Sequence, residues 1–186
     1  MRARKVQLAP QDQTALHVIR LNERLSPLDA VYRRYGRYVA AVILRLEGRQ
    51  SEVEDLVQEV FVQATRGLAR LQQPEAIKGW LATIAVRVVR RHLRRRRLRA
   101  FLGRDTGADY MNLVDLSASP MDRLILNAVY RVLDEIPTND RIAFCMHVIE
   151  GEQLEAVARL CSCSRATAKR RIARAQRAIE ERMGDG

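Results

Sequence analysis

The sequence of 186 residues is poor in aromatic residues, glycine, proline and cysteine, and each shortage excludes a class of fold. With 5% aromatic residues, 9 glycines and 5 prolines, it lacks the β-favouring residues and turn signals of a sandwich or barrel. Three cysteines, an odd number in a chain of this length, do not suggest a disulfide framework. No apolar run is long enough to cross a bilayer, and residues 1–10 lack the apolar core of a signal peptide. We therefore expect a cytoplasmic protein with no membrane insertion.

Helix-forming and basic residues are abundant instead. Hydrophobic residues make up 47% of the chain, enough for a packed core, and leucine, alanine, valine and arginine dominate. The net charge of +11 is unevenly spread. Residues 1–102 hold 21 basic and 9 acidic residues (net +12), residues 103–122 hold 1 and 4 (net −3), and residues 123–186 hold 11 and 9 (net +2). A basic surface of this size points to a polyanion, either nucleic acid or an anionic membrane surface.

Apolar residues recur at helical spacing in the first half of the chain, over residues 28–46, 53–64 and 80–88. Gly48 is the predicted C-cap of the first helix. Ser51 with Glu54 predicts a capping box for the second helix, and Pro74 is the predicted first residue of the third. The third helix then runs into a nearly continuous series of arginines, which repel one another and favour a partner with negative charge.

Residues 103–121, rich in glycine, serine and aspartate, lose this periodicity and are predicted to be a flexible linker. Helical spacing returns behind it, over residues 126–136, 142–149, 154–161 and 165–183. Because no segment has the alternation of a strand, the predicted fold class is all-α, with two small helical domains at 26–102 and 122–186. Residues 1–25 are a weakly patterned N-terminal extension.

The end of the chain has the layout of a helix-turn-helix, with a helix over 152–160, a turn at 161–163 and a second helix over 164–179. Ser164 is the predicted N-cap of the second helix. A helix of this kind fits the major groove of B-DNA, where basic side chains reach base edges and phosphates. Its outer face carries Arg165, Lys169, Arg170, Arg171, Arg174 and Arg177. The alternative interpretation is an ordinary solvated basic helix.

Both predicted domains resemble one family, the extracytoplasmic-function (ECF) RNA polymerase sigma factors of the sigma-70 family. The segments similar to its region 4 are RIAF at 141–144, EGEQLEAVA at 150–158 and SRATAKRRIARA at 164–175. Those similar to its region 2 are VEDLVQEVFVQA at 53–64 and GWLATIA at 79–85. The two regions stand in the family's order, and an arginine-rich run follows region 2 as it does in the family.

The resemblance implies a non-enzymatic protein that binds core RNA polymerase, reads the −35 and −10 promoter elements and helps to melt the −10 DNA. It implies no cofactor or metal, and an anti-sigma factor as a further partner. The residues implied to contact the polymerase are Glu54, Asp55, Gln58 and Glu59. Those implied at the −10 element are Arg87, Arg90, Arg91, Arg94 and Arg95, with a loop over 67–75 as the pocket for an extruded base. Those implied at the −35 element are Arg165, Lys169, Arg170, Arg171 and Arg174.

The sequence departs from the family at two places that bear on function. Arg87 and Arg91 stand where the family commonly has asparagine and aspartate, so contacts with the −10 element are expected to rely more on phosphate. In the turn of the helix-turn-helix, Ser162 replaces a usual glycine and is expected to adopt a strained backbone. Cys161 and Cys163 replace the usual leucine and isoleucine beside it.

Two other groups of residues are interpreted as structural. Trp80 follows the apolar spacing of its helix, which predicts core packing rather than base stacking. Cys145, His147, Cys161 and Cys163 lack the CxxC spacing typical of a zinc site, and the cysteines fall at apolar or turn positions. We therefore expect these cysteines to pack in the core, and we expect no metal site.

Two other classes of function fit the residues less well. A stand-alone helix-turn-helix regulator is the alternative function, but it does not need the polar face at residues 54–59. A nucleic-acid enzyme needs a carboxylate cluster, a Ser/His/Asp arrangement or a glycine-rich phosphate loop, and the sequence has no such pattern. We therefore expect no catalytic residue.

Overall fold

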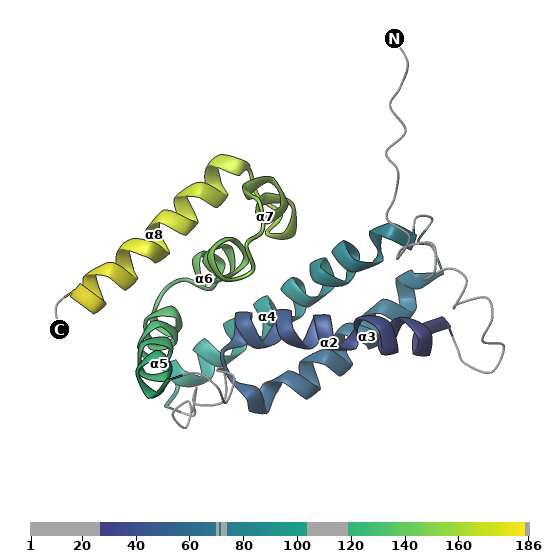
Figure 1. Cartoon of the computed structure of the whole chain (residues 1–186), viewed down its shortest axis with the longest axis horizontal. Helices are drawn as coiled ribbons and strands as arrows, with labels where there is room; N and C mark the ends of the chain where they lie inside the picture. Colours follow the sequence, from purple (N-terminus) through teal and green to yellow (C-terminus); the bar gives the residue numbers. More distant parts are fainter. Residues whose placement is uncertain (1–26, 70, 72–73, 104–118, 185–186) are drawn as a thin grey trace, which may run out of the picture.

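The computed structural model describes residues 27–69, 71, 74–103 and 119–184. All regular structure in these residues is helical, which confirms the predicted all-α class. The helices form two groups that are joined through the predicted linker (Figure 1). The first group comprises α2 (Pro27–Glu47), α3 (Val53–Leu68) and α4 (Ile77–Phe101). The second comprises α5 (Pro120–Glu135), α6 (Thr138–Phe144), α7 (Leu154–Leu160) and α8 (Arg165–Gly184). The N-terminal extension and most of the linker lie outside the described residues.

The first group forms around the apolar stripe predicted for α3. The stripe is buried against α2 and α4 as expected, through Val53, Leu56, Val57, Val60, Phe61 and Ala64. Gly48 ends α2 with a φ of 78°, a left-handed conformation that glycine adopts without strain. The capping box predicted at Ser51 is wrong, because Gln50–Glu52 form a 3-10 turn that continues directly into α3. An N-cap needs extended backbone, and Ser51 lies inside this helical turn instead.

Helix α4 is 25 residues long and carries both the apolar stripe and the arginine run. It begins at Ile77 rather than at Pro74, because Pro74–Ala76 form a separate 3-10 turn. Trp80 is half-buried and packs on α3, as predicted. The contact is close enough that a methyl group on Gly67 would lie 2.7 Å from the Trp80 ring, so the ring would have to shift to admit it.

Helix α5 begins inside the segment predicted to be linker. The Ser119 hydroxyl accepts a hydrogen bond from the Asp122 amide at 3.1 Å, and the Asp122 carboxylate accepts one from the Ser119 amide at 3.3 Å. With Pro120 as the first helical residue, this is a complete capping box. The prediction of linker up to residue 121 is therefore two residues too long, because serine, proline and aspartate are helix-start signals as well as loop residues.

The predicted helix-turn-helix is formed by α7 and α8. The turn is a Schellman motif, in which the Cys163 amide donates to the Ala158 carbonyl at 3.0 Å and the Ser162 amide to the Arg159 carbonyl at 3.1 Å. Ser162 has a φ of 50°, which confirms the expected left-handed backbone. The Ser164 hydroxyl then accepts a hydrogen bond from the Thr167 amide at 3.1 Å, so the predicted N-cap of α8 is also confirmed. Together these two motifs set the direction in which α8 leaves the turn.

The three cysteines are free thiols, and Cys145 and Cys161 are buried, as expected from their spacing. Burial raises the pKa of the Cys145 thiol to about 12, which keeps it neutral at physiological pH. Among the described residues, no group of histidine, cysteine and acidic side chains could hold a metal ion. No helix in the described ranges is long and apolar enough to cross a membrane.

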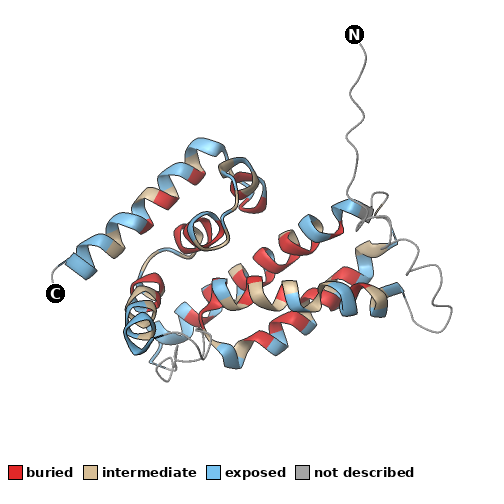
Figure 2. Ribbon diagram, viewed as in Figure 1, coloured by how far each residue is buried: buried red, intermediate tan, exposed pale blue. Residues whose placement is uncertain are grey.

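The two groups of helices also pack against each other. Helix α4 contacts α6 and α7, and α2 contacts the π-helical turn Cys145–Ile149 that follows α6. The buried side chains form one continuous cluster that includes residues of both groups. Figure 2 shows buried residues along α4 and α2 and again in α5, α6 and α7. The predicted linker therefore joins two helical units that are in direct contact.

Candidate functional site

Three of the four residues predicted to contact a protein partner share an exposed face of α3. Glu54, Asp55 and Gln58 are exposed, while the opposite face of the helix is buried in the core. Beside this polar face a groove of about 670 Å³ lies between α2 and α3. Val57 and Gly36 contribute to its apolar lining. Arg33, Arg37, Glu54 and Gln58 also line it, and a partly apolar groove with charged and hydrogen-bonding groups is suited to hold a helix of another protein.

The fourth residue of that predicted set, Glu59, is engaged within the chain. It is half-buried and forms an ion pair with Arg91 of α4, and it accepts a hydrogen bond from Gln63 at 3.2 Å. Glu59 and Arg91 were predicted for different partners, and the structure brings them together. The family commonly has aspartate where this chain has Arg91. The ion pair accounts for this difference, because an arginine at this position of α4 meets a carboxylate on α3.

The basic residues predicted at the −10 element form a stripe along α4. Arg87, Arg91, Arg94 and Arg95 are exposed and follow one another at helical spacing. Arg90 differs, because it is half-buried and lies beside the thiol of Cys161 in the turn before α8. Its Nε and Nη2 atoms are buried and have no hydrogen-bond partner among the residues that the structure describes. The loop predicted at 67–75 is described in part only.

The basic residues predicted at the −35 element lie on α8 behind the Ser164 cap. Arg165, Lys169 and Arg170 are exposed. Arg171 is half-buried. Arg174 forms a two-armed ion pair with the buried Asp140 of α6, with distances of 2.7 and 2.8 Å. Arg174 thus joins α8 to α6, and Asp140 is a residue of the site that was not predicted from the sequence.

A buried ionic cluster, formed by Glu47, Arg96, Asp134 and Arg141, was also not predicted from the sequence. Glu47, Arg96 and Arg141 are buried. Burial raises the pKa of Glu47 to about 7, against the opposing effect of Arg96 and Arg141. The signal for Arg96 was present, because it continues the buried stripe of Val89 and Leu93 at a spacing of seven and three residues. A basic residue at a core position predicts buried carboxylates nearby.

Two protein-family models match the chain, and each covers one group of helices. Residues 31–99 match sigma-70 region 2, which contains the acidic face of α3 and the basic stripe of α4. Residues 126–179 match sigma-70 region 4, which contains the helix-turn-helix. Both matches coincide with the segments whose motifs resembled these regions.

Curated proteins of the same kind align with most of the chain. The RNA polymerase sigma-H factor of Pseudomonas aeruginosa is 25% identical over 93% of this chain and 94% of its own length. The ECF RNA polymerase sigma-E factor of Escherichia coli is 27% identical over 81% of this chain and 83% of its own. A probable RNA polymerase sigma factor RfaY of Xanthomonas campestris is 27% identical over 80% of this chain, which spans 40% of that protein.

The fold is also found among solved structures. The sigma factor RpoE of Bartonella quintana, solved in complex with the anti-sigma factor NepR, has a TM-score of 0.60 and 22% sequence identity to this chain. The similarity covers 80% of this chain and 91% of that one.

Proposed function

This chain belongs to the sigma-70 family of RNA polymerase sigma factors, and on that premise we propose which of its surfaces carry out promoter-specific transcription initiation. One observation carries the proposal. Each family match contains an exposed surface of the expected chemistry, polar on α3 and basic on α4 and α8. A sigma factor acts by binding and not by catalysing a reaction, and we propose the same for this chain. We also propose that it works in the cytoplasm.

Core polymerase would bind the exposed face of α3. Glu54 and Asp55 carry negative charge and Gln58 both donates and accepts hydrogen bonds, which suits a basic partner helix seated along the groove between α2 and α3. Glu59 would contribute less to this contact than its neighbours, because it is already paired with Arg91. The polymerase face is thereby centred on the first turn and a half of α3.

The −10 element would lie along α4. Arg87, Arg94 and Arg95 are exposed and at spacings that suit successive phosphates of a melted strand. Arg91 is exposed as well, and would bring its Glu59 partner near the DNA. The segment 67–75, which leads into α4, would supply the pocket for an extruded base.

The −35 element would be read by α8. Its N-terminal turn presents backbone amides to a phosphate, and Arg165, Lys169 and Arg170 are exposed to reach base edges in the major groove. Arg171 is half-buried and would contact DNA only through its exposed part. Arg174 would act mainly by positioning, because Asp140 holds its guanidinium against α6.

An anti-sigma factor is the regulatory partner we propose for this chain. The supporting observation is that the sigma factor RpoE of similar fold was solved in complex with such a protein. The partner would act by covering the surfaces on α3 or α8 that polymerase and DNA require.

The test is run-off transcription on a pool of promoter fragments with purified core polymerase, with and without the chain. We expect transcripts from particular fragments, and their loss when Asp55 and Gln58 are changed to alanine. Glu180→Ala is the matched control, because it removes an exposed carboxylate from α8, away from α3. DNA binding without any transcript would instead indicate the stand-alone regulator.

A further inference from the structure

We propose that the end of α4 binds the surface of an anionic lipid bilayer, through an apolar tip that enters the headgroup region and through arginines that pair with lipid phosphates. The tip consists of Leu98, Phe101 and Leu102, and the flanking arginines are Arg94, Arg95 and Arg99. The chain would lie on such a membrane without any segment crossing it. The binding itself is independent of the proposed function, and only its consequence for promoter DNA rests on that function.

The apolar tip is the first observation. The side chains of Leu98, Phe101 and Leu102 are 61%, 86% and 56% exposed. They are spaced three and four residues apart from Leu98, so they lie on one side of the helix and form a single apolar surface. Isolated exposed apolar residues are common on proteins, whereas a contiguous group of large ones marks a surface that binds a partner.

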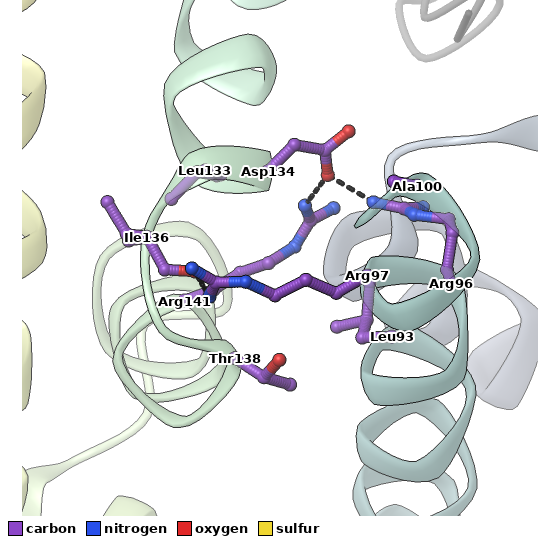
Figure 3. Close-up of a pocket in the computed structure, with 9 residues that line it drawn as sticks. All are labelled: Leu93, Arg96, Arg97, Ala100, Leu133, Asp134, Ile136, Thr138 and Arg141. Carbon is purple, nitrogen blue, oxygen red and sulfur yellow. Dashed lines mark hydrogen bonds and ion pairs between the residues drawn. The ribbon is translucent and has the colours of Figure 1, made fainter. Parts of the chain in front are cut away.

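The fold holds the tip in its exposed position. On another side of the same helix end, Arg97 donates hydrogen bonds to the carbonyls of Glu135 and Ile136, at 3.2 and 2.9 Å. Figure 3 shows Arg96 and Arg97 reaching from α4 toward this end of α5. Gly103 then ends the helix with a φ of 67°, and a Cβ there would meet no atom within 4 Å. The end of α4 is therefore anchored on one side, and its apolar tip projects into solvent.

The charge around the tip is the second observation. Helix α4 has no acidic residue in its 25 residues. The flanking arginines Arg94, Arg95 and Arg99 are exposed, and none of them forms an ion pair within the part of the chain that the structure describes. Each arginine near an anionic bilayer strengthens attachment about fivefold. The surface around the tip thus has the charge that complements an anionic membrane.

A bilayer accounts for both observations together. Phenylalanine and leucine beside basic residues are the composition of helices that lie at a membrane interface. Arginine also suits this position, because its apolar stem can follow the tip while its guanidinium stays with the phosphates. Nucleic acid would pair with the arginines and can stack on Phe101, but Leu98 and Leu102 have no π face and would stay in water. The membrane is therefore the partner that uses the whole surface.

Membrane binding would compete with promoter binding. Arg94 and Arg95 belong both to the flanking arginines and to the surface proposed for the −10 element. A guanidinium that pairs with a lipid phosphate is not available to a phosphate of DNA. A chain bound to the membrane would therefore be kept from the −10 element until it is released.

The experiment measures sedimentation of the full chain with vesicles made of equal parts of phosphatidylglycerol and phosphatidylcholine, or of phosphatidylcholine alone. The tip variant, Leu98→Gln with Phe101→Gln, keeps every arginine. The charge variant, Arg95→Gln with Arg99→Gln, keeps the tip. Leu124→Gln is the matched control, because Leu124 is 64% exposed but lies on α5 and not among the arginines of α4. All these residues are exposed, so each variant should keep native helix content by circular dichroism.

A fluorescence measurement separates entry of the tip from attraction by charge alone. Phe101→Trp places an indole at the tip, and the wild type, with Trp80 as its one tryptophan, supplies the background. Anionic vesicles should shift the emission of the Phe101→Trp variant to shorter wavelengths, and lipids with brominated acyl chains should quench it. The emission of Trp80 in the wild type should change in neither case.

We expect the wild type to sediment with the anionic vesicles and not with phosphatidylcholine alone. The tip and charge variants should each bind the anionic vesicles at least about tenfold more weakly, and the control should bind as the wild type does. Absence of wild-type binding, an equal loss in the control, or unchanged emission of the Phe101→Trp variant would overturn the proposal. So would a single-stranded oligonucleotide whose binding depends on the tip as strongly as vesicle binding does. A chain that binds vesicles through the tip but yields no transcript would overturn the proposed function alone.

Discussion

Replacing Ser162 with glycine is expected to stabilise the helix-turn-helix. Ser162 is exposed and has a φ of 50°, which costs an L-residue about 1–2 kcal/mol because its Cβ approaches the following carbonyl. Glycine has no such cost, but it loses about 0.5–1 kcal/mol more conformational entropy on folding. The difference predicts a gain of about 0.5–1 kcal/mol in the free energy of unfolding. Both Schellman hydrogen bonds use backbone atoms and remain.

The gain is best measured by urea denaturation, followed by far-ultraviolet circular dichroism and by the fluorescence of Trp80. Trp80 lies in the first group of helices, so its fluorescence reports that group, whereas circular dichroism reports all helices. In thermal unfolding the same gain would raise Tm by about 1–4 °C. Ser164→Ala, two residues on, is the matched control, and it should lower stability by about 1 kcal/mol through loss of the N-cap hydrogen bond.

An unchanged or lowered stability of the Ser162→Gly variant would refute this reasoning. It would mean that the Ser162 side chain contributes as much to the folded state as its backbone conformation costs. A shift of the Trp80 transition together with the circular dichroism transition would add a second conclusion, because it would show that the two groups of helices unfold as one cooperative unit.

Three further predictions follow from particular contacts. Gly67→Ala should lower stability by about 1–3 kcal/mol and shift Trp80 fluorescence, since its methyl group would overlap the indole; unchanged fluorescence would contradict the contact. Because burial raises the pKa of Glu47 to about 7, its contribution to stability is complete below its unfolded pKa and is lost as pH rises through 7. The stability of wild type relative to Glu47→Gln should therefore fall by up to about 3 kcal/mol between pH 5 and 8, and a flat difference in urea denaturation would refute this. Asp140→Asn should weaken binding of a −35 duplex in titrations although it is buried beneath α8, and unchanged affinity would show that Arg174 needs no partner.

The helices were predictable from the sequence because their apolar stripes are long and regular. The structure confirms the buried stripe of α3, the strained backbone expected at Ser162 and the N-cap predicted at Ser164. The helix starts were harder to predict, because serine, proline and aspartate occur in N-caps, in 3-10 turns and in loops. Ser51 lies within a 3-10 turn and not at a cap, whereas Ser119, interpreted as linker, forms a complete capping box. The backbone conformation of each serine separates these two cases, because Ser119 is extended and Ser51 lies within a helical turn.

The contacts of the charged residues could not be predicted in the same way. The apolar spacing of α4 places Arg96 on its buried side and Arg94 off it, but it does not show which carboxylates Arg96 meets. One of them is Glu47, at the end of α2. The other is Asp134, which lies 38 residues beyond Arg96 and meets it only when the two groups of helices pack together. Pairing across such a distance is decided by tertiary structure.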